Sequence, residues 1–172
     1  MADRLVRLAR LRVPLGFAAT SAALVLARPT WPSWTLGLLV SCLGEVIRVW
    51  AAGHLEKSRE VTTSGPYRWT RHPLYLGSSV IALGIVLAGR SAVVALLAAV
   101  YLGVTYTAAI RTEEAFLRQA FGDAYDRYSH RRDAPMNRRF SLERAWRNRE
   151  YRAIVGLAIG FGILALRMQL PI

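Results

Sequence analysis

Long apolar runs alternate with short polar connections along most of this chain. Five of them approach the roughly 20 residues that a helix needs to cross a ~30 Å hydrocarbon core. The run at 91–110 is apolar on every side of a helix, whereas soluble bundle helices keep a polar stripe. We therefore expect an all-α membrane protein with about five transmembrane helices, against the alternative of a soluble bundle with very apolar helices. The expected spans cover residues 13–28, 34–53, 72–89, 91–110 and 153–170.

The basic residues predict an orientation for these spans. Nineteen of them fall in the N-terminal tail, the second connection and the fourth connection, and three (Arg28, Arg90 and Arg167) fall on the other side. Cytoplasmic loops carry such an excess of Lys and Arg. The N-terminus is therefore expected inside and the C-terminus outside. The segment 111–152 is expected to form cytoplasmic helices in the membrane interface, because Leu117, Phe121 and Tyr125 recur at helical spacing.

Composition narrows the class of protein further. The 172 residues are 53% hydrophobic and contain one cysteine, which excludes a disordered chain and a disulfide-stapled domain. Length favours a single domain over residues 1–172. A net charge of +12 would suggest nucleic acid in a soluble protein, but here it is explained by anionic lipid headgroups. No nucleic-acid partner and no metal site are expected.

The second connection carries the first candidate chemistry. It runs from Ser64 to Gly77 as SGPYRWTRHPLYLG, with a turn at Gly65-Pro66 and Pro73 suited to the first turn of a helix. Tyr, Arg and His side chains are thereby placed at the cytoplasmic mouth of the third span. A plain aromatic and basic interface belt would show the same residue types.

Two adjacent carboxylates, Glu113 and Glu114, follow the fourth span. The third span runs outward and the fourth runs back, so these carboxylates and His72 are expected at the same membrane face. They could pair with nearby arginines or bind a cationic group of a ligand. Their place beside the His and Tyr residues favours the ligand.

A third charged feature lies inside the second span. Glu45 and Arg48 are three residues apart and share a helix face. Charged residues within a span usually face the protein interior or water. Opposite charges at this spacing favour a structural pair over part of a pocket.

These motifs together resemble one family of membrane enzymes. The matching elements are Gly65-Pro66-Tyr67, then Arg71-His72-Pro73-x-Tyr75-x-Gly77, then Glu113-Glu114 and Phe121-Gly122-x-x-Tyr125-x-x-Tyr128. In order and spacing, over about residues 44–130, they are similar to the isoprenylcysteine carboxyl methyltransferases and the broader phospholipid methyltransferase-like group. The resemblance implies methyl transfer from S-adenosylmethionine to a lipophilic acceptor.

The resemblance also implies roles for particular residues. Glu114, or its neighbour Glu113, would hold the amino group of the methionine part, and Glu114 would belong to the catalytic centre. Arg131 or Arg132 would contact the acceptor, although the run after Arg132 departs from the family pattern. The cofactor pocket would be lined by Gly65, Tyr67, Arg71, His72, Pro73 and Tyr75.

Several alternatives stay open at this stage. The partner is expected to be a lipophilic small molecule or a prenylated acceptor, methylated at an isoprenylcysteine-like carboxylate; a phospholipid or another lipophilic amine is the alternative. A sterol-type reductase using NADPH fits less well, because adjacent glutamates would repel its phosphate. A non-enzymatic protein that binds anionic lipid is a further possibility. We expect an integral protein of a bacterial cytoplasmic membrane whose site faces the cytoplasm; the oligomeric state is open.

Overall fold

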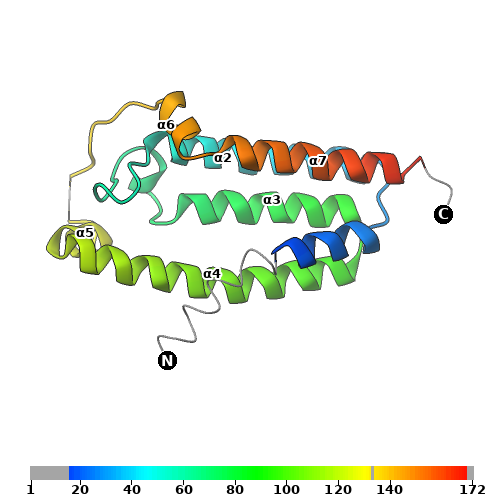
Figure 1. Ribbon diagram of the computed structural model, residues 1–172, viewed down its shortest axis with the longest axis horizontal. Helices are drawn as coiled ribbons and strands as arrows, with labels where there is room; N and C mark the ends of the chain where they lie inside the picture. Colours follow the sequence, from blue (N-terminus) through cyan, green and yellow to red (C-terminus); the bar gives the residue numbers. More distant parts are fainter. Residues whose placement is uncertain (1–15, 133, 170–172) are drawn as a thin grey trace.

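The computed structural model describes residues 16–132 and 134–169, and every regular element in that part of the chain is helical. The long helices lie side by side along the longest axis of the molecule, and the short ones gather with the loops at one end (Figure 1). The expectation of an all-α fold is therefore confirmed. The long helices are Gly16–Leu26, α2 (Trp31–His54), α3 (Pro73–Gly89), α4 (Ala92–Phe121) and α7 (Tyr151–Arg167); the short ones are η1 (Gly65–Arg68), α5 (Asp123–Ser129) and α6 (Leu142–Arg147).

Local capping explains where the helices begin. Thr30 and Ser33 form a reciprocal capping box at the start of α2, and the Ser91 hydroxyl accepts a bond from the Val94 amide at the start of α4. Ser141 caps α6 in the same way, by accepting from the Arg144 amide at 3.3 Å. Pro73 occupies the first turn of α3, as its sequence position predicts.

Glycines bring α2 and α3 together into the most closely packed pair of helices. A Cβ atom placed on Gly44 would lie 2.6 Å from the carbonyl oxygen of Gly77. About two helical turns along, a Cβ atom on Gly37 would come just as close to the carbonyl oxygen of Gly84. Small residues that let two backbones approach are typical of helix contacts in membranes. This contact fixes the start of α3, and with it the candidate chemical residues at its N-terminus.

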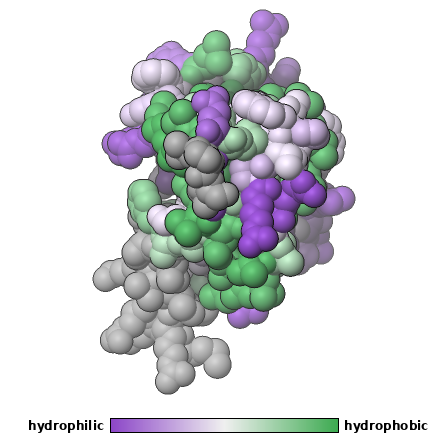
Figure 2. Space-filling view, turned by 90° about the vertical axis from the view of Figure 1, so that its right-hand side faces the viewer, coloured by the Kyte–Doolittle hydropathy of each residue, from purple (hydrophilic) through white to green (hydrophobic). Residues whose placement is uncertain are grey.

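Among the helices in the described part of the chain, α2 and α4 are long and apolar enough to cross a membrane. Aliphatic side chains point outward from both, among them Leu39, Leu43, Leu96 and Val100. The end of the molecule that carries the α3–α4 turn shows hydrophobic and hydrophilic side chains together (Figure 2). Outward-facing apolar helices are what a lipid environment requires, so the chain associates with the membrane.

The helices depart from the expected ranges in three places. α4 continues past Ile110 to Phe121, so Glu113 and Glu114 lie on the same helix as the fourth span rather than in a separate segment. The expected helix through Leu117 and Tyr125 is interrupted at Gly122, whose φ of +48° ends α4 and starts α5. The first expected span is helical over Gly16–Leu26, while residues 13–15 and the basic N-terminal tail lie outside the described residues.

Candidate active site

The two halves of the motif, more than forty residues apart in sequence, meet at the carboxylate of Glu114. His72 caps the N-terminus of α3, and its Nε2 lies 3.2 Å from Glu114 Oε1. Arg71 Nη1 lies 3.2 Å from the same oxygen. The expectation that His72 and a following carboxylate share one face of the molecule is therefore confirmed, and the structure distinguishes Glu114 from the exposed Glu113.

Electrostatics keep the Glu114 carboxylate ionised. Its partial burial opposes the charge, but the hydrogen bond from His72 and the positive charge of Arg71 outweigh that penalty, so the pKa of Glu114 is lowered. A carboxylate of this kind accepts hydrogen bonds and attracts cations at neutral pH. At neutral pH the Glu114 carboxylate is a poor base, because a carboxyl group with a lowered pKa binds a proton weakly.

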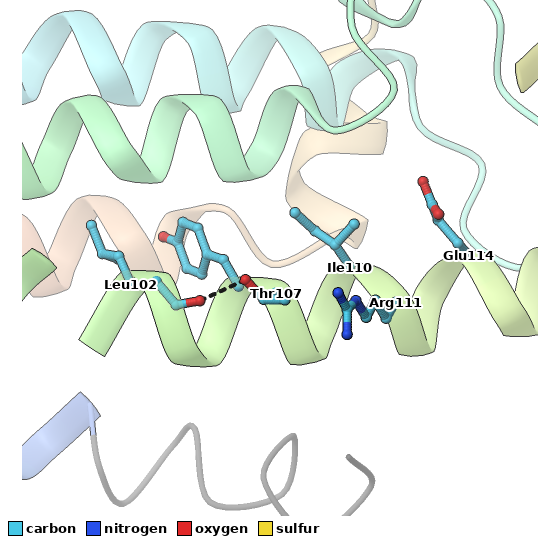
Figure 3. A pocket seen from close by; sticks show the side chains of 7 residues that line it. Leu102, Thr107, Ile110, Arg111 and Glu114 are labelled. Atoms are coloured by element: carbon cyan, nitrogen blue, oxygen red, sulfur yellow. Dashed lines mark hydrogen bonds between the residues drawn. The ribbon is translucent and has the colours of Figure 1, made fainter. Parts of the chain in front are cut away.

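Aromatic rings continue the site from His72 toward the middle of the bundle. The His72 and Tyr75 rings meet edge to face with centroids 5.9 Å apart, and those of Tyr75 and Tyr106 meet at 5.0 Å. In Figure 3, Glu114 and Ile110 project from α4 on the side of α3. They help to line a hollow of about 550 Å³ along α4, with Leu102, Gly103, Tyr106, Thr107 and Arg111.

The Gly-Pro-Tyr element forms the helical turn η1, which leads in the chain to Arg71 and His72. Gly65 has a φ of +56° and lies against the ring of His54, where any side chain would collide. Tyr67 is buried, and its carbonyl oxygen accepts a 2.9 Å hydrogen bond from the Tyr128 hydroxyl. Burial raises the pKa of Tyr67, and it raises that of Tyr128 to about 12, so both phenols keep their protons. Tyr128 thus joins α5 to η1 as a structural donor.

Arg131 and Arg132, the two expected acceptor contacts, lie in different surroundings. Arg131 has a φ of +56°, and its Nη2 is 3.5 Å from the carbonyl oxygen of Trp69, between η1 and His72. Arg132 lines a separate hollow over α5 together with Asp123 and Asp126. Of the two, Arg131 is the one that the fold brings beside the residues of the motif.

The pair expected inside α2 is present but weak, and a third residue dominates it. Arg48 Nε lies 3.8 Å from Glu45, whereas Arg48 Nη2 donates to both carboxylate oxygens of Glu150 at 2.9 Å. Arg48 also bonds to the hydroxyl of Ser78 on α3. The α2 helix is continuous through Glu45. Sequence spacing revealed only the local partner, because nothing in the sequence pairs Arg48 with a residue at the start of α7.

Tyr106 is the site residue that the sequence reasoning missed. It contacts Tyr75 and lines the hollow next to Glu114. Its signal was available: Tyr106 precedes Glu114 by about two helical turns and so shares its face of α4.

The donor set fits the methionine part of S-adenosylmethionine. An ionised carboxylate at Glu114 suits an ammonium group, and the neighbouring rings of Tyr75 and Tyr106 suit a sulfonium, since aromatic faces attract cations. Arg71 suits a carboxylate. Within residues 16–132 and 134–169, no group of three or more His, Cys, Asp or Glu side chains could hold a metal ion.

A helical membrane protein with this site belongs to a known class. The model of the phospholipid methyltransferase family matches residues 32–124, so the chain belongs to that family and to the methyltransferases. The matched region contains α2, η1, α3 and α4, including the meeting of His72 with Glu114. The resemblance read from the motifs is therefore confirmed at the level of the family.

Matches to individual proteins cover only part of each chain. The chain is 37% identical over 110 residues to the cobalt-zinc-cadmium resistance protein CzcN of Cupriavidus metallidurans, covering 61% of this chain and 50% of that protein. It is 34% identical over 105 residues to the protein-S-isoprenylcysteine O-methyltransferase of Schizosaccharomyces pombe, covering 54% and 44%. The chain thus spans about half the length of the curated relatives it matches. No solved structure matches it.

Proposed function

We propose that this protein transfers a methyl group from S-adenosylmethionine to a lipophilic acceptor at the cytoplasmic face of a bacterial membrane. The observation that carries the proposal is the convergence of Arg71, His72 and Glu114 at one carboxylate oxygen. Family membership supports methyl transfer, and one relative is named as an isoprenylcysteine O-methyltransferase. The name of the family itself points to phospholipids as a second acceptor class.

The cofactor supplies an activated methyl group when bound, so the protein needs mainly to bind and orient. In our proposal Glu114 attracts the amino group, while His72 and Arg71 keep that carboxylate ionised and aimed. Tyr75 and Tyr106 provide ring faces beside it. Orientation of this kind can lower a barrier by several kcal/mol without a covalent or metal-bound intermediate.

The acceptor is proposed to be a carboxylate of the isoprenylcysteine type. Such an acceptor is already ionised at neutral pH and requires only a cation to hold it, a role we assign to Arg131. An amine acceptor must first lose a proton. The lowered pKa of Glu114 and the raised pKa values of Tyr67 and Tyr128 make these three groups poor bases, which favours the carboxylate.

The first experiment is calorimetry of the purified protein in detergent with S-adenosylmethionine, S-adenosylhomocysteine and NADPH. We expect saturable micromolar binding of the first two and none of NADPH. Methyl transfer to S-farnesylcysteine and to phosphatidylethanolamine is then compared, with the carboxylate expected to react. A folded sample that binds neither adenosyl compound would overturn the proposal, and methylation of the amine alone would transfer it to the second acceptor class.

A further inference from the structure

A large apolar cavity lies inside the bundle, away from the charged end. Its volume is about 730 Å³, within the range of about 300–1,000 Å³ that small-molecule sites occupy. Four elements wall it: the helix Gly16–Leu26, α3, α4 and α7. Its lining is aliphatic over most of its length, as at Ala23, Ala82, Ala98 and Leu164. The proposed methyl transfer does not by itself account for this space.

One end of the cavity is polar and leads toward Glu114. Ser78 and Tyr106 line that end. Tyr106 and Leu102 also line the hollow that reaches Glu114, so these two side chains border both spaces. A molecule in the cavity would therefore present its polar end toward the proposed cofactor pocket and its apolar end away from it.

The shape of the cavity selects its occupant. Val94 and Tyr106 both line it and lie twelve residues apart on α4, a distance of about 18 Å at 1.5 Å per residue. The lining along this length is almost wholly apolar. An elongated apolar space that begins beside the proposed site suits the hydrocarbon chain of an acceptor.

Glycines on α7 leave the cavity open. Gly156 and Gly160 are one turn apart and line it, and a Cβ on either would meet nothing within 4 Å. The glycines of α2 and α3 differ, because they permit close backbone contact. On α7 the missing side chains serve no contact among the described residues, so their effect is the width of the cavity.

We propose that this cavity holds the hydrocarbon chain of the methyl acceptor, and that Gly156 and Gly160 determine the length of chain accepted. The proposal rests on the proposed function, since it assigns a place to the acceptor of that reaction. The polar head would pass Ser78 and Tyr106 and reach toward the Glu114 hollow, the direction in which the proposed carboxylate contact, Arg131, would hold it. The chain would extend between α4 and α7 toward Leu164.

The test compares Gly160→Leu with Gly162→Leu. Gly162 is two residues further along the same helix, has equally open surroundings and does not line the cavity. We expect Gly160→Leu to lower kcat/KM for S-farnesylcysteine roughly 10- to 100-fold, the scale of size discrimination in an apolar pocket. The short-chain acceptor S-dimethylallylcysteine should react as it does with the wild type. The Gly162→Leu variant should keep the wild-type kcat/KM for both acceptors. Gly156→Leu, one turn away, is a second variant with the same expectation.

A second readout does not depend on turnover. S-Farnesylcysteine with a diazirine at the end of its chain is photolysed on the wild-type protein, and the labelled peptides are identified by mass spectrometry. Label in α7 or α4 near the cavity, lost in Gly160→Leu and kept in Gly162→Leu, supports the inference. Label elsewhere, or equal loss of both acceptors in Gly160→Leu with cofactor affinity intact, overturns it. If the wild type methylates no acceptor, the proposed function fails, and the labelling still decides whether the cavity holds the chain.

Discussion

Glu114 is the residue on which most of the proposed site depends. It is the common partner of His72 and Arg71, and it lines the hollow along α4. Replacing it with Gln keeps the shape and removes the charge. We expect the dissociation constant for S-adenosylhomocysteine to rise roughly 10- to 150-fold, since a hydrogen bond to a charged group contributes about 1.5–3 kcal/mol. Calorimetry measures this directly.

The adjacent glutamate provides a matched control. Glu113 carries the same charge on the same helix but is exposed. Glu113→Gln is therefore expected to change the dissociation constant less than threefold or so, an effect on the scale of a solvent-screened charge. Equal losses in the two variants would mean that general negative charge at the surface attracts the cofactor, and the specific role of Glu114 would be wrong.

The lowered pKa of Glu114 also predicts a dependence of stability on pH. A carboxyl group whose folded pKa lies below its unfolded value stabilises the fold above the unfolded pKa, and this contribution is lost as pH falls through the folded pKa. Thermal unfolding of the wild type and of Glu114→Gln should therefore differ at neutral pH and converge in acid, below pH ~4. A difference that stays constant into acid would contradict the lowered pKa.

At the scale of the elements, Arg48 ties three helices together. From α2 it bonds to Ser78 on α3 and to Glu150 at the start of α7, while the buried carboxylate oxygens of Glu45 accept no hydrogen bond in the described part of the chain. Removing one partner of a buried ion pair costs up to about 3–5 kcal/mol. We expect Glu150→Gln to lower the melting temperature in detergent markedly and Glu45→Gln to leave it unchanged or raise it.

These two substitutions are matched in chemistry and differ only in which carboxylate is lost. The comparison therefore tests whether Arg48 is paired as the structure shows. A larger fall in melting temperature for Glu45→Gln than for Glu150→Gln would mean that Glu45 is the main partner of Arg48, as the spacing in the sequence suggested.

Helix contacts also show which parts of the molecule the sequence could predict. The apolar runs predicted the helices, because helix formation depends on local pattern. The opposite directions of two consecutive helices predicted that His72 and Glu114 lie at the same end of the molecule. The same sequence did not distinguish Gly44, which packs against Gly77, from Gly160, which faces open space. Nor did it reveal Arg48 with Glu150, since that pair depends on how α7 docks.

The glycine difference yields a prediction for the α2–α3 contact. Gly44→Leu would force a side chain into the backbone of α3 near Gly77 and Ile81. We expect this variant to lose its folded fraction in detergent, as judged by size-exclusion chromatography and thermal unfolding. Gly162→Leu adds the same side chain in open space and should elute and melt like the wild type. A normally folded Gly44→Leu protein would show that the two helices are not in close contact.

For the whole molecule, the arrangement in the membrane is the property that most constrains function. The proposed site needs a soluble cofactor, and its loops with α5 and α6 gather at one end, opposite the α3–α4 turn at Arg90 (Figure 1). The excess of basic residues at the site end predicts that this end is cytoplasmic. Five spans and this orientation are accordingly expected together; within residues 16–132 and 134–169, α2 and α4 are the helices long and apolar enough to cross a membrane.

Cysteine labelling of whole cells tests that arrangement. In a Cys42→Ser background, Arg90→Cys should react with a membrane-impermeant maleimide from outside, because Arg90 is exposed at the α3–α4 turn. His130→Cys, exposed at the end of α5, should react only after the cells are permeabilised. The reverse pattern would place the site outside the cell, away from the cytoplasmic pool of S-adenosylmethionine, and methyl transfer by this site would then have no donor. Labelling of both positions from outside would instead rule out a molecule that spans the membrane between them.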